Sequence, residues 1–111
     1  MTEYEAPLAD LVVLDLTRAL AGPQAALMLG DMGARVIKVE MPGAGDDSRA
    51  FGPFVNGKSL YFSALNYDKQ SIALDLGRQE DREVFEGLLE LADVVVENFR
   101  PGTMEKLGYG W

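Results

Sequence analysis

Four arginines of this chain each follow a run of residues that predicts a β-strand, and arginine is well suited to holding a phosphate. They are Arg18, Arg49, Arg78 and Arg100. A guanidinium group donates several hydrogen bonds in a fixed planar geometry that matches a phosphate. Because ligands of parallel sheets bind beyond the carboxyl ends of the strands, the four side chains could form one anion site. The alternative is four solvated loop residues, and the pattern alone favours neither.

Two short polar motifs in the same loops could also contact a ligand. Asn98 can both donate and accept hydrogen bonds, and Phe99 beside it offers a flat ring at the exit of a strand. The alternative for this pair is a capped turn before a helix. Asp46 and Asp47 could bind a cation, but the chain has no histidine and no suitably spaced carboxylate. We therefore expect Asp46 and Asp47 to form a solvated turn, without a metal.

Composition excludes several classes of function. The 111 residues include no cysteine and no histidine, which excludes disulfide scaffolds, thiolate nucleophiles and Ser-His-Asp catalysis within them. A net charge of −8 argues against a nucleic acid or an anionic membrane surface as partner. The hydrophobic fraction of 48% is typical of soluble globular chains. The first ten residues are acidic and do not resemble a signal peptide, so we expect a cytoplasmic protein.

Apolar runs alternating with helical patterns must position these residues. Strands are predicted over residues 11–16, 35–40, 71–76 and 93–97, and helices over 23–32, 79–92 and 101–107. Pro23 suits the first position of a helix, and Gly33 suits a left-handed residue after its end. This alternation predicts an α/β fold, a Rossmann-like and mainly parallel sheet with helices on both faces.

The remaining segments are less regular. Residues 41–58 hold four glycines and two prolines and predict a long irregular loop. Residues 59–66 fit either a short helix or an extended segment. In the helix over 79–92, we expect Val84, Leu88 and Leu91 to form the apolar stripe, joined by Phe85 and Leu89.

The first strand, helix and second strand imitate a dinucleotide-binding unit in which Glu40 ends the second strand. The turn over residues 16–23 holds a single glycine, whereas the dinucleotide motif Gly-x-Gly-x-x-Gly needs three. The phosphate-binding motif of nucleotide hydrolases is absent as well. We therefore expect Glu40 to be solvated or paired with a cation and not to bind a ribose.

Five motifs, taken together and in order, resemble the beginning of the class III CoA-transferases, the CaiB/BaiF family. They lie at residues 14–23, 29–40, 42–49, 66–76 and 92–102. Members of this family are several times longer and form interlocked homodimers. The resemblance implies that residues 1–111 are the N-terminal part of the large Rossmann-like domain, and hence a fragment.

The family moves CoA from an acyl-CoA donor to a carboxylic acid. An aspartate forms an acyl anhydride with the donor and then an aspartyl-CoA thioester, which is covalent catalysis by a carboxylate. The resemblance places that aspartate beyond residue 111, so no catalytic residue is assigned in this chain, and the chain alone is expected to be inactive. Coenzyme A is implied as a substrate, with no tightly bound cofactor.

The resemblance also implies which residues contact CoA. A turn over residues 18–21 would border the thioester and pantetheine, and further residues would contact mainly the nucleotide end. The implied set is Arg18, Ala19, Leu20, Ala21, Leu74, Asn98, Phe99 and Lys106. Three positions depart from some members: Met41 and Lys106 replace arginines, and Leu20 replaces a glutamine of formyl-CoA transferase. These departures argue against oxalate and formate as the acid pair and leave the acid open.

Three alternatives remain. A 2-methylacyl-CoA racemase of the same family is disfavoured, because racemase-like members carry glycine at the position of Asn98 and Asp-Arg-Pro at the position of residues 40–42. The others are a non-catalytic nucleotide-binding module and a structural half-domain completed by another chain.

Overall fold

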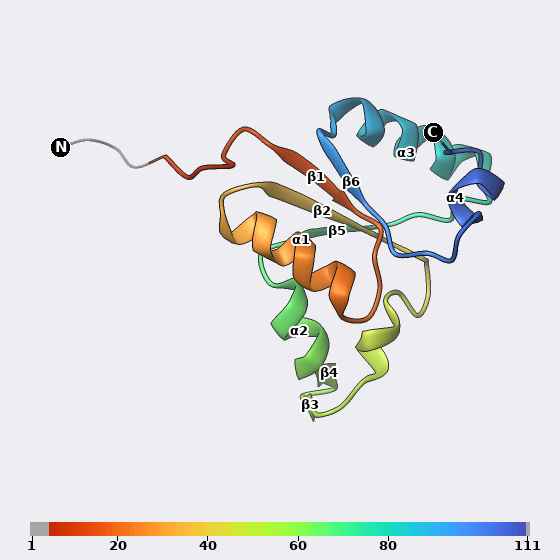
Figure 1. The fold of residues 1–111 in the computed structure, drawn as a ribbon. Helices are drawn as coiled ribbons and strands as arrows, with labels where there is room; N and C mark the ends of the chain where they lie inside the picture. Colours follow the sequence, from red (N-terminus) through yellow and green to blue (C-terminus); the bar gives the residue numbers. More distant parts are fainter. Residues whose placement is uncertain (1–4, 111) are drawn as a thin grey trace.

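Four parallel strands form the centre of the chain, in the order β5-β2-β1-β6 (Figure 1). The computed structural model describes residues 5–110, so Trp111 and the first four residues of the acidic leader lie outside it. The strands are β1 (Val12–Asp15), β2 (Arg35–Glu40), β5 (Gln70–Ala73) and β6 (Val94–Val96). Leu14 in β1 lies opposite Ile37 in β2 and Val95 in β6. The predicted parallel sheet is confirmed.

Helices cover both faces of this sheet, as predicted (Figure 1). α1 (Ala21–Asp31) packs on one face, with α2 (Leu60–Asn66) beside it. α3 (Gln79–Leu91) and α4 (Thr103–Lys106) lie on the other face. Side chains alternate along a strand, so Val13 faces Ala26 of α1 whereas Leu14 faces Phe85 of α3. The two small cores are therefore separated by the sheet itself.

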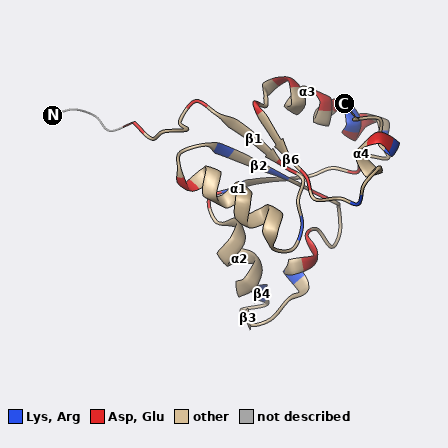
Figure 2. Ribbon diagram, viewed as in Figure 1, with Lys and Arg blue, Asp and Glu red and all other residues tan. Residues whose placement is uncertain are grey.

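The apolar stripe of α3 differs from the predicted one. Phe85 is fully buried and Leu88 and Leu89 are half-buried, whereas Val84 and Leu91 are 46% and 67% exposed. Successive residues of a helix are turned by about 100°, so Val84 and Leu91 both lie about 100° or more round the axis from Phe85. The stripe that faces the sheet is centred on Phe85. The outer surface of α3 is acidic (Figure 2).

Residues 41–58, predicted as an irregular loop, contain regular structure. A 3₁₀ helix, η1 (Asp47–Ala50), is followed by a hairpin of β3 (Phe54–Val55) and β4 (Lys58–Ser59). Asn56 and Gly57 both have positive φ, as a tight hairpin turn requires. The ambiguous segment after it is the helix α2, which begins because the hydroxyl of Ser59 accepts a hydrogen bond from the Phe62 N–H at 3.0 Å.

The ends of several elements shift by two or three residues from those predicted. α1 begins two residues before the buried Pro23, and Gly33 after it has φ of +107°, which confirms the predicted left-handed residue. α4 is a single turn that follows Gly102, which has φ of +88°. Among residues 5–110, no helix has both the length and the apolar composition of a membrane span.

Candidate functional site

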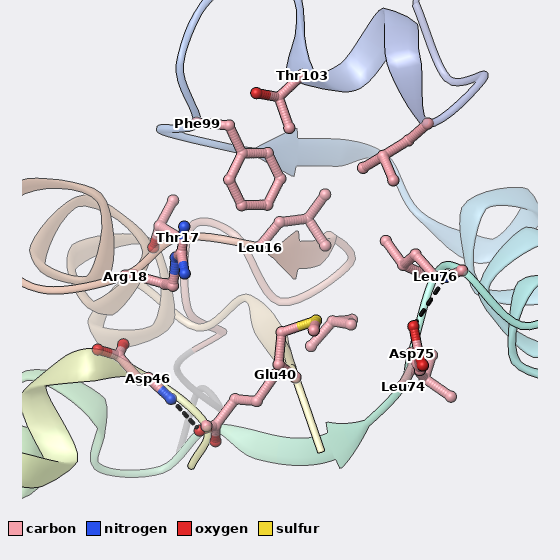
Figure 3. Close-up of a pocket in the computed structure, with 15 residues that line it drawn as sticks. Leu16, Thr17, Arg18, Glu40, Asp46, Leu74, Asp75, Leu76, Phe99 and Thr103 are labelled. Atoms are coloured by element: carbon pink, nitrogen blue, oxygen red, sulfur yellow. Dashed lines mark hydrogen bonds between the residues drawn. The ribbon is translucent and has the colours of Figure 1, made fainter. Parts of the chain in front are cut away.

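A cavity of about 360 Å³ opens beyond the carboxyl ends of the strands (Figure 3). Its wall is formed by the end of β2, by the loops that follow β1, β2, β5 and β6, and by α4 with the residue after it. The apolar part of the wall comprises Leu16, Val39, Met41, Leu74, Leu76, Phe99 and Leu107. The polar part comprises Thr17, Arg18, Glu40, Asp46, Asp75 and Thr103. The cavity therefore lies where ligands of parallel sheets bind.

Three of the predicted CoA-contacting residues line this cavity, namely Arg18, Leu74 and Phe99. The side chains of Leu16 and Phe99 point into it from neighbouring loops (Figure 3). The guanidinium carbon of Arg18 lies 5.8 Å from the centre of the Phe99 ring, within the range of a cation–π contact. An apolar slot with one guanidinium at its edge can take a flat base whose substituent carries negative charge.

The other predicted residues lie around the cavity and are not part of its wall among the residues the structure describes. The Asn98 side chain forms two hydrogen bonds with the Arg18 backbone: it accepts from N–H at 3.1 Å and donates to C=O at 2.9 Å. Leu20 and Ala21 are exposed before and at the start of α1, and Lys106 is exposed on α4. The structure thus places Asn98 behind Arg18, where it holds the loop.

The four arginines do not gather at one point, contrary to the anion-site interpretation. Arg49 forms an ion pair with Glu40 at 2.7 Å, and its guanidinium lies 3.8 Å from the centre of the Phe62 ring. Arg78 pairs with an exposed glutamate, and Arg100 lines a separate cavity of about 270 Å³. Within residues 5–110, Arg18 is the one member of this set that lines the larger cavity.

A buried ionic network under the cavity was missed by the sequence analysis. The Lys38 ammonium lies 2.8 Å from a carboxylate oxygen of Asp46, and the Lys69 ammonium lies 2.8 Å from Asp15. All four side chains are at most 2% exposed. The expectation of a solvated turn is therefore wrong for Asp46, whereas Asp47 is exposed. Burial is tolerated here because each carboxylate faces a cation.

The Asp46 carboxylate also organises the loop around it. One oxygen accepts hydrogen bonds from the Ser48 N–H at 2.9 Å, the Ser48 hydroxyl at 2.8 Å and the Ala19 N–H at 3.0 Å. Burial alone would raise the pKa of Asp46, but the contacts with Lys38, Ala19 and Ser48 outweigh burial and lower it. Asp46 is therefore a buried, ionised cap of η1. The described residues contain no group of three or more carboxylates arranged for a metal ion.

Glu40 is paired with a cation, which was one of the two expected states. Its carboxylate accepts hydrogen bonds from two Arg49 nitrogens at 2.7 Å each, from the Asp46 N–H at 2.8 Å and from the Ser71 hydroxyl at 2.9 Å. Burial alone would raise the pKa of Glu40, but these donors, led by Arg49, hold it at about 2, against an ordinary value of 4.5.

Glu40 is expected to make the folded state sensitive to acid. Because its pKa is lowered on folding, the stabilisation from ionised Glu40 is complete above about pH 4.5 and is lost as the pH falls towards 2. A Glu40→Gln variant should lose less unfolding free energy than the parent over this interval, measured by urea unfolding of the full-length protein. Glu80→Gln, at an exposed ion pair, is the control and should follow the parent. Parallel curves for the parent and Glu40→Gln would contradict this prediction.

One signal in the sequence could have revealed the network, and the backbone at Gly45 agrees with it. Lys38 interrupts the buried run of β2 between Ile37 and Val39, and a lysine in such a run needs a buried partner. Gly45 has φ of +68°, and a Cβ at this position would collide with the Glu40 carboxylate. The wall residues Thr103 and Leu107 carried no such signal, because their place depends on how α4 packs, and Leu76 lies in the loop after β5.

Comparison with known proteins shows which family this chain belongs to. Residues 8–111 match the family model described as CoA-transferase family III. The chain belongs to this family. The resemblance stated from the sequence motifs is thus confirmed.

Individual relatives within family III are similar over almost all of this chain. It is 50% identical over 105 residues to the acetyl-CoA:oxalate CoA-transferase of Acetobacter aceti, which covers 95% of this chain and 27% of that protein. It is 54% identical over 109 residues to a succinyl-CoA:mesaconate CoA-transferase of Haloarcula hispanica, covering 94% of this chain and 27% of that protein. The chain therefore spans about a quarter of the length of these curated relatives.

Two solved structures share the fold of this chain. The CAIB/BAIF family protein from Brucella suis superposes with a TM-score of 0.89 at 44% sequence identity, covering 97% of this chain and 30% of that one. A protein from Mycobacterium tuberculosis gives a TM-score of 0.86 at 45% identity, covering 96% and 29%. The α/β fold described above is thus the fold of the matching part of these family III structures.

Proposed function

We propose that this family III chain is the N-terminal part of a CoA-transferase and supplies part of its CoA site. The observation that carries the proposal is the cavity at the carboxyl edge of the sheet, which combines Arg18, Leu74 and Phe99. The names of the relatives support the activity, since they are CoA-transferases that match over nearly all of this chain. The coverage of about a quarter of each relative supports the proposal that a longer protein carries the chain.

The cavity suits the nucleotide end of CoA. Its apolar wall and the Phe99 ring would contact the flat base, and the Arg18 guanidinium would face a phosphate. Three carboxylates lie in the wall and could repel this anion. Glu40 is paired with Arg49 and Asp46 with Lys38, while Asp75 lies across the cavity from Arg18 (Figure 3). The local charge near Arg18 is therefore compatible with an anionic ligand, although the whole chain carries a net charge of −8.

The proposed reaction exchanges CoA between two carboxylic acids. An aspartate beyond these residues attacks the acyl-CoA carbonyl, and the CoA thiolate leaves to give an acyl anhydride. The thiolate then attacks the aspartyl carbonyl, which releases the donor acid and forms aspartyl-CoA. The acceptor carboxylate attacks this thioester, which expels the CoA thiolate and forms a second anhydride. The thiolate finally attacks the acceptor's carbonyl in that anhydride, which gives the product and frees the aspartate. The part played by this chain is to hold the CoA while its thiolate leaves and returns.

The remaining parts of the proposal concern the acid and the assembly. The acids in the relatives' names, which include oxalate, glutarate, mesaconate and L-malate, are dicarboxylic, so we propose a dicarboxylic acceptor. An interlocked homodimer, a cytoplasmic location and the lack of a tightly bound cofactor are further proposals that rest on the family resemblance. CoA transfer from succinyl-CoA to a panel of mono- and dicarboxylic acids tests the acceptor class. CoA binding without any transfer would favour the non-catalytic nucleotide-binding module.

Replacing Asn98 with alanine is expected to weaken CoA binding. Each of its two hydrogen bonds with the Arg18 backbone contributes about 0.5–1.5 kcal/mol, and their loss would free the loop that presents Arg18 to the cavity. Isothermal titration of the full-length protein with CoA measures the effect. Gln79→Ala, an exposed residue at the start of α3, is the control. An unchanged dissociation constant for Asn98→Ala would leave Asn98 as a turn residue with no part in binding.

A further inference from the structure

The turn that follows β1 is held mainly by side chains from other parts of the chain. The Thr17 N–H donates to Asp15 at 2.9 Å, and the Thr17 C=O accepts from the Lys38 ammonium at 3.0 Å. The Ala19 N–H donates to Asp46 at 3.0 Å. Arg18, between them, forms both of its backbone hydrogen bonds with Asn98. A turn fixed in this way depends on residues distant in the sequence.

Ala19 occupies a conformation that alanine does not favour. Its φ is +72°, in the left-handed region, where the Cβ of an L-residue crowds the backbone. Such a conformation persists only where the surroundings hold it. The hydrogen bond from the Ala19 N–H to the buried Asp46 carboxylate is the contact that holds it here.

Lys38 and Asp46 act on the two sides of Arg18. Lys38 binds the carbonyl of Thr17 before it, and Asp46 binds the N–H of Ala19 after it, while the two side chains form an ion pair with each other. The orientation of the Arg18 side chain over the Phe99 ring follows from the course of this backbone. Lys38 thus reaches the ligand cavity through the turn, and Asp46, which also lies in the cavity wall, acts on the same turn.

We infer that Asp46 and Lys38 are positioning residues of the ligand site, which hold Ala19 in the left-handed conformation and thereby direct Arg18 towards a phosphate of the ligand. The inference rests on the proposed function in naming CoA as that ligand. Its structural half, the dependence of Ala19 on Asp46, stands on the contacts alone.

The test compares Asp46→Asn with Asp47→Asn in the full-length protein. The two aspartates are adjacent, but Asp46 is buried and Asp47 is exposed, so the pair separates the contact from the loss of a charge. We expect CoA to bind at least about tenfold more weakly to Asp46→Asn, and within about twofold of the parent to Asp47→Asn. Isothermal titration measures the affinity. The hydrogen-exchange rate of the Ala19 amide in protein labelled with ¹⁵N-alanine reports the turn, and it should rise in Asp46→Asn alone.

A rescue experiment distinguishes positioning from general damage. Glycine adopts positive φ without the cost that alanine bears. The double variant with Ala19→Gly and Asp46→Asn should therefore bind CoA at least about threefold more tightly than Asp46→Asn alone. Ala44→Gly, at an exposed alanine of the same loop region, should give no such gain. If Asp46→Asn does not fold, Ala19→Val replaces it, because a β-branched residue resists positive φ while the ion pair remains. It should weaken CoA binding at least about tenfold, and Ala44→Val should not.

The outcomes separate this inference from the proposed function. Equal exchange of the Ala19 amide in the parent and Asp46→Asn would overturn the positioning role, whatever happens to CoA. Unchanged CoA affinity in Asp46→Asn, or equal rescue by Ala19→Gly and Ala44→Gly, would overturn it as well. A parent protein that binds no CoA would overturn the proposed function, while faster Ala19 exchange in Asp46→Asn would still support the structural half.

Discussion

Replacing Lys38 with methionine is expected to destabilise the folded protein by about 3–5 kcal/mol, because it leaves the buried Asp46 carboxylate without its cation. The ammonium lies 2.8 Å from Asp46 and 3.8 Å from Asp15, and all three side chains are at most 1% exposed. Methionine keeps much of the length and volume of lysine, so the loss reports the charge more than the packing. Urea unfolding of the full-length protein at neutral pH measures the change.

The control for this prediction is Arg78→Met, which breaks an ion pair at the surface. Both side chains of the Arg78–Glu80 pair are more than 60% exposed, and such pairs contribute about 0–1 kcal/mol. A double variant with Lys38→Met and Asp46→Asn should recover part of the loss, because it removes both charges together. A loss below about 1 kcal/mol for Lys38→Met would contradict the view that this pair is buried and essential to the fold.

Replacing Phe85 with alanine is expected to cost a similar amount, about 3–5 kcal/mol. The Phe85 side chain is fully buried between α3 and the sheet, against Leu14 and Ile37. Its ring also meets the Tyr109 ring edge to face, with centres 4.9 Å apart. Truncation would leave a cavity in the core on this face of the sheet. The melting temperature and the urea midpoint of the full-length protein report the loss.

Val84 provides the matched control for Phe85. It is the preceding residue of α3 and is 46% exposed, so Val84→Ala removes few buried contacts. Its effect should stay within about 0.5 kcal/mol, which is usual for surface substitutions. Equal losses for the two variants would show that the apolar stripe of α3 is centred elsewhere than on Phe85.

The centre of the sheet could be predicted from the sequence because β1 and β2 are mostly buried and mostly apolar. β2 coincides with the predicted residues 35–40, and the predicted segment that contains β1 shows the same continuous hydrophobic pattern. Such a run is what a strand covered by helices on both faces requires. Residues 41–58 were harder, since their hairpin is only two residues long on each side and depends on the turn at Asn56 and Gly57.

The candidate site could be predicted only in part, because its polar contacts join residues distant in the sequence. Arg18 and Phe99 were found at their strand ends, and both line the cavity. The pairing of Arg49 with Glu40 removed one arginine from the expected anion site, although both ends of this pair were visible in the sequence. Asp46 was misjudged because its cation, Lys38, lies within β2 while Asp46 lies in the loop after that strand, and no local pattern connects the two.

Together with the Glu40–Arg49 pair, the buried network contains three carboxylates, from Asp15, Glu40 and Asp46, and three cations, from Lys38, Lys69 and the partly exposed Arg49. The charges of these six side chains balance, so a single substitution that removes one of them disturbs the neutrality of the whole group. The two residues of each ion pair are therefore expected to change together in evolution. A protein that loses one charge of a pair would retain function only after its partner has changed as well. Protein engineers who diversify the region should accordingly vary these codons in pairs.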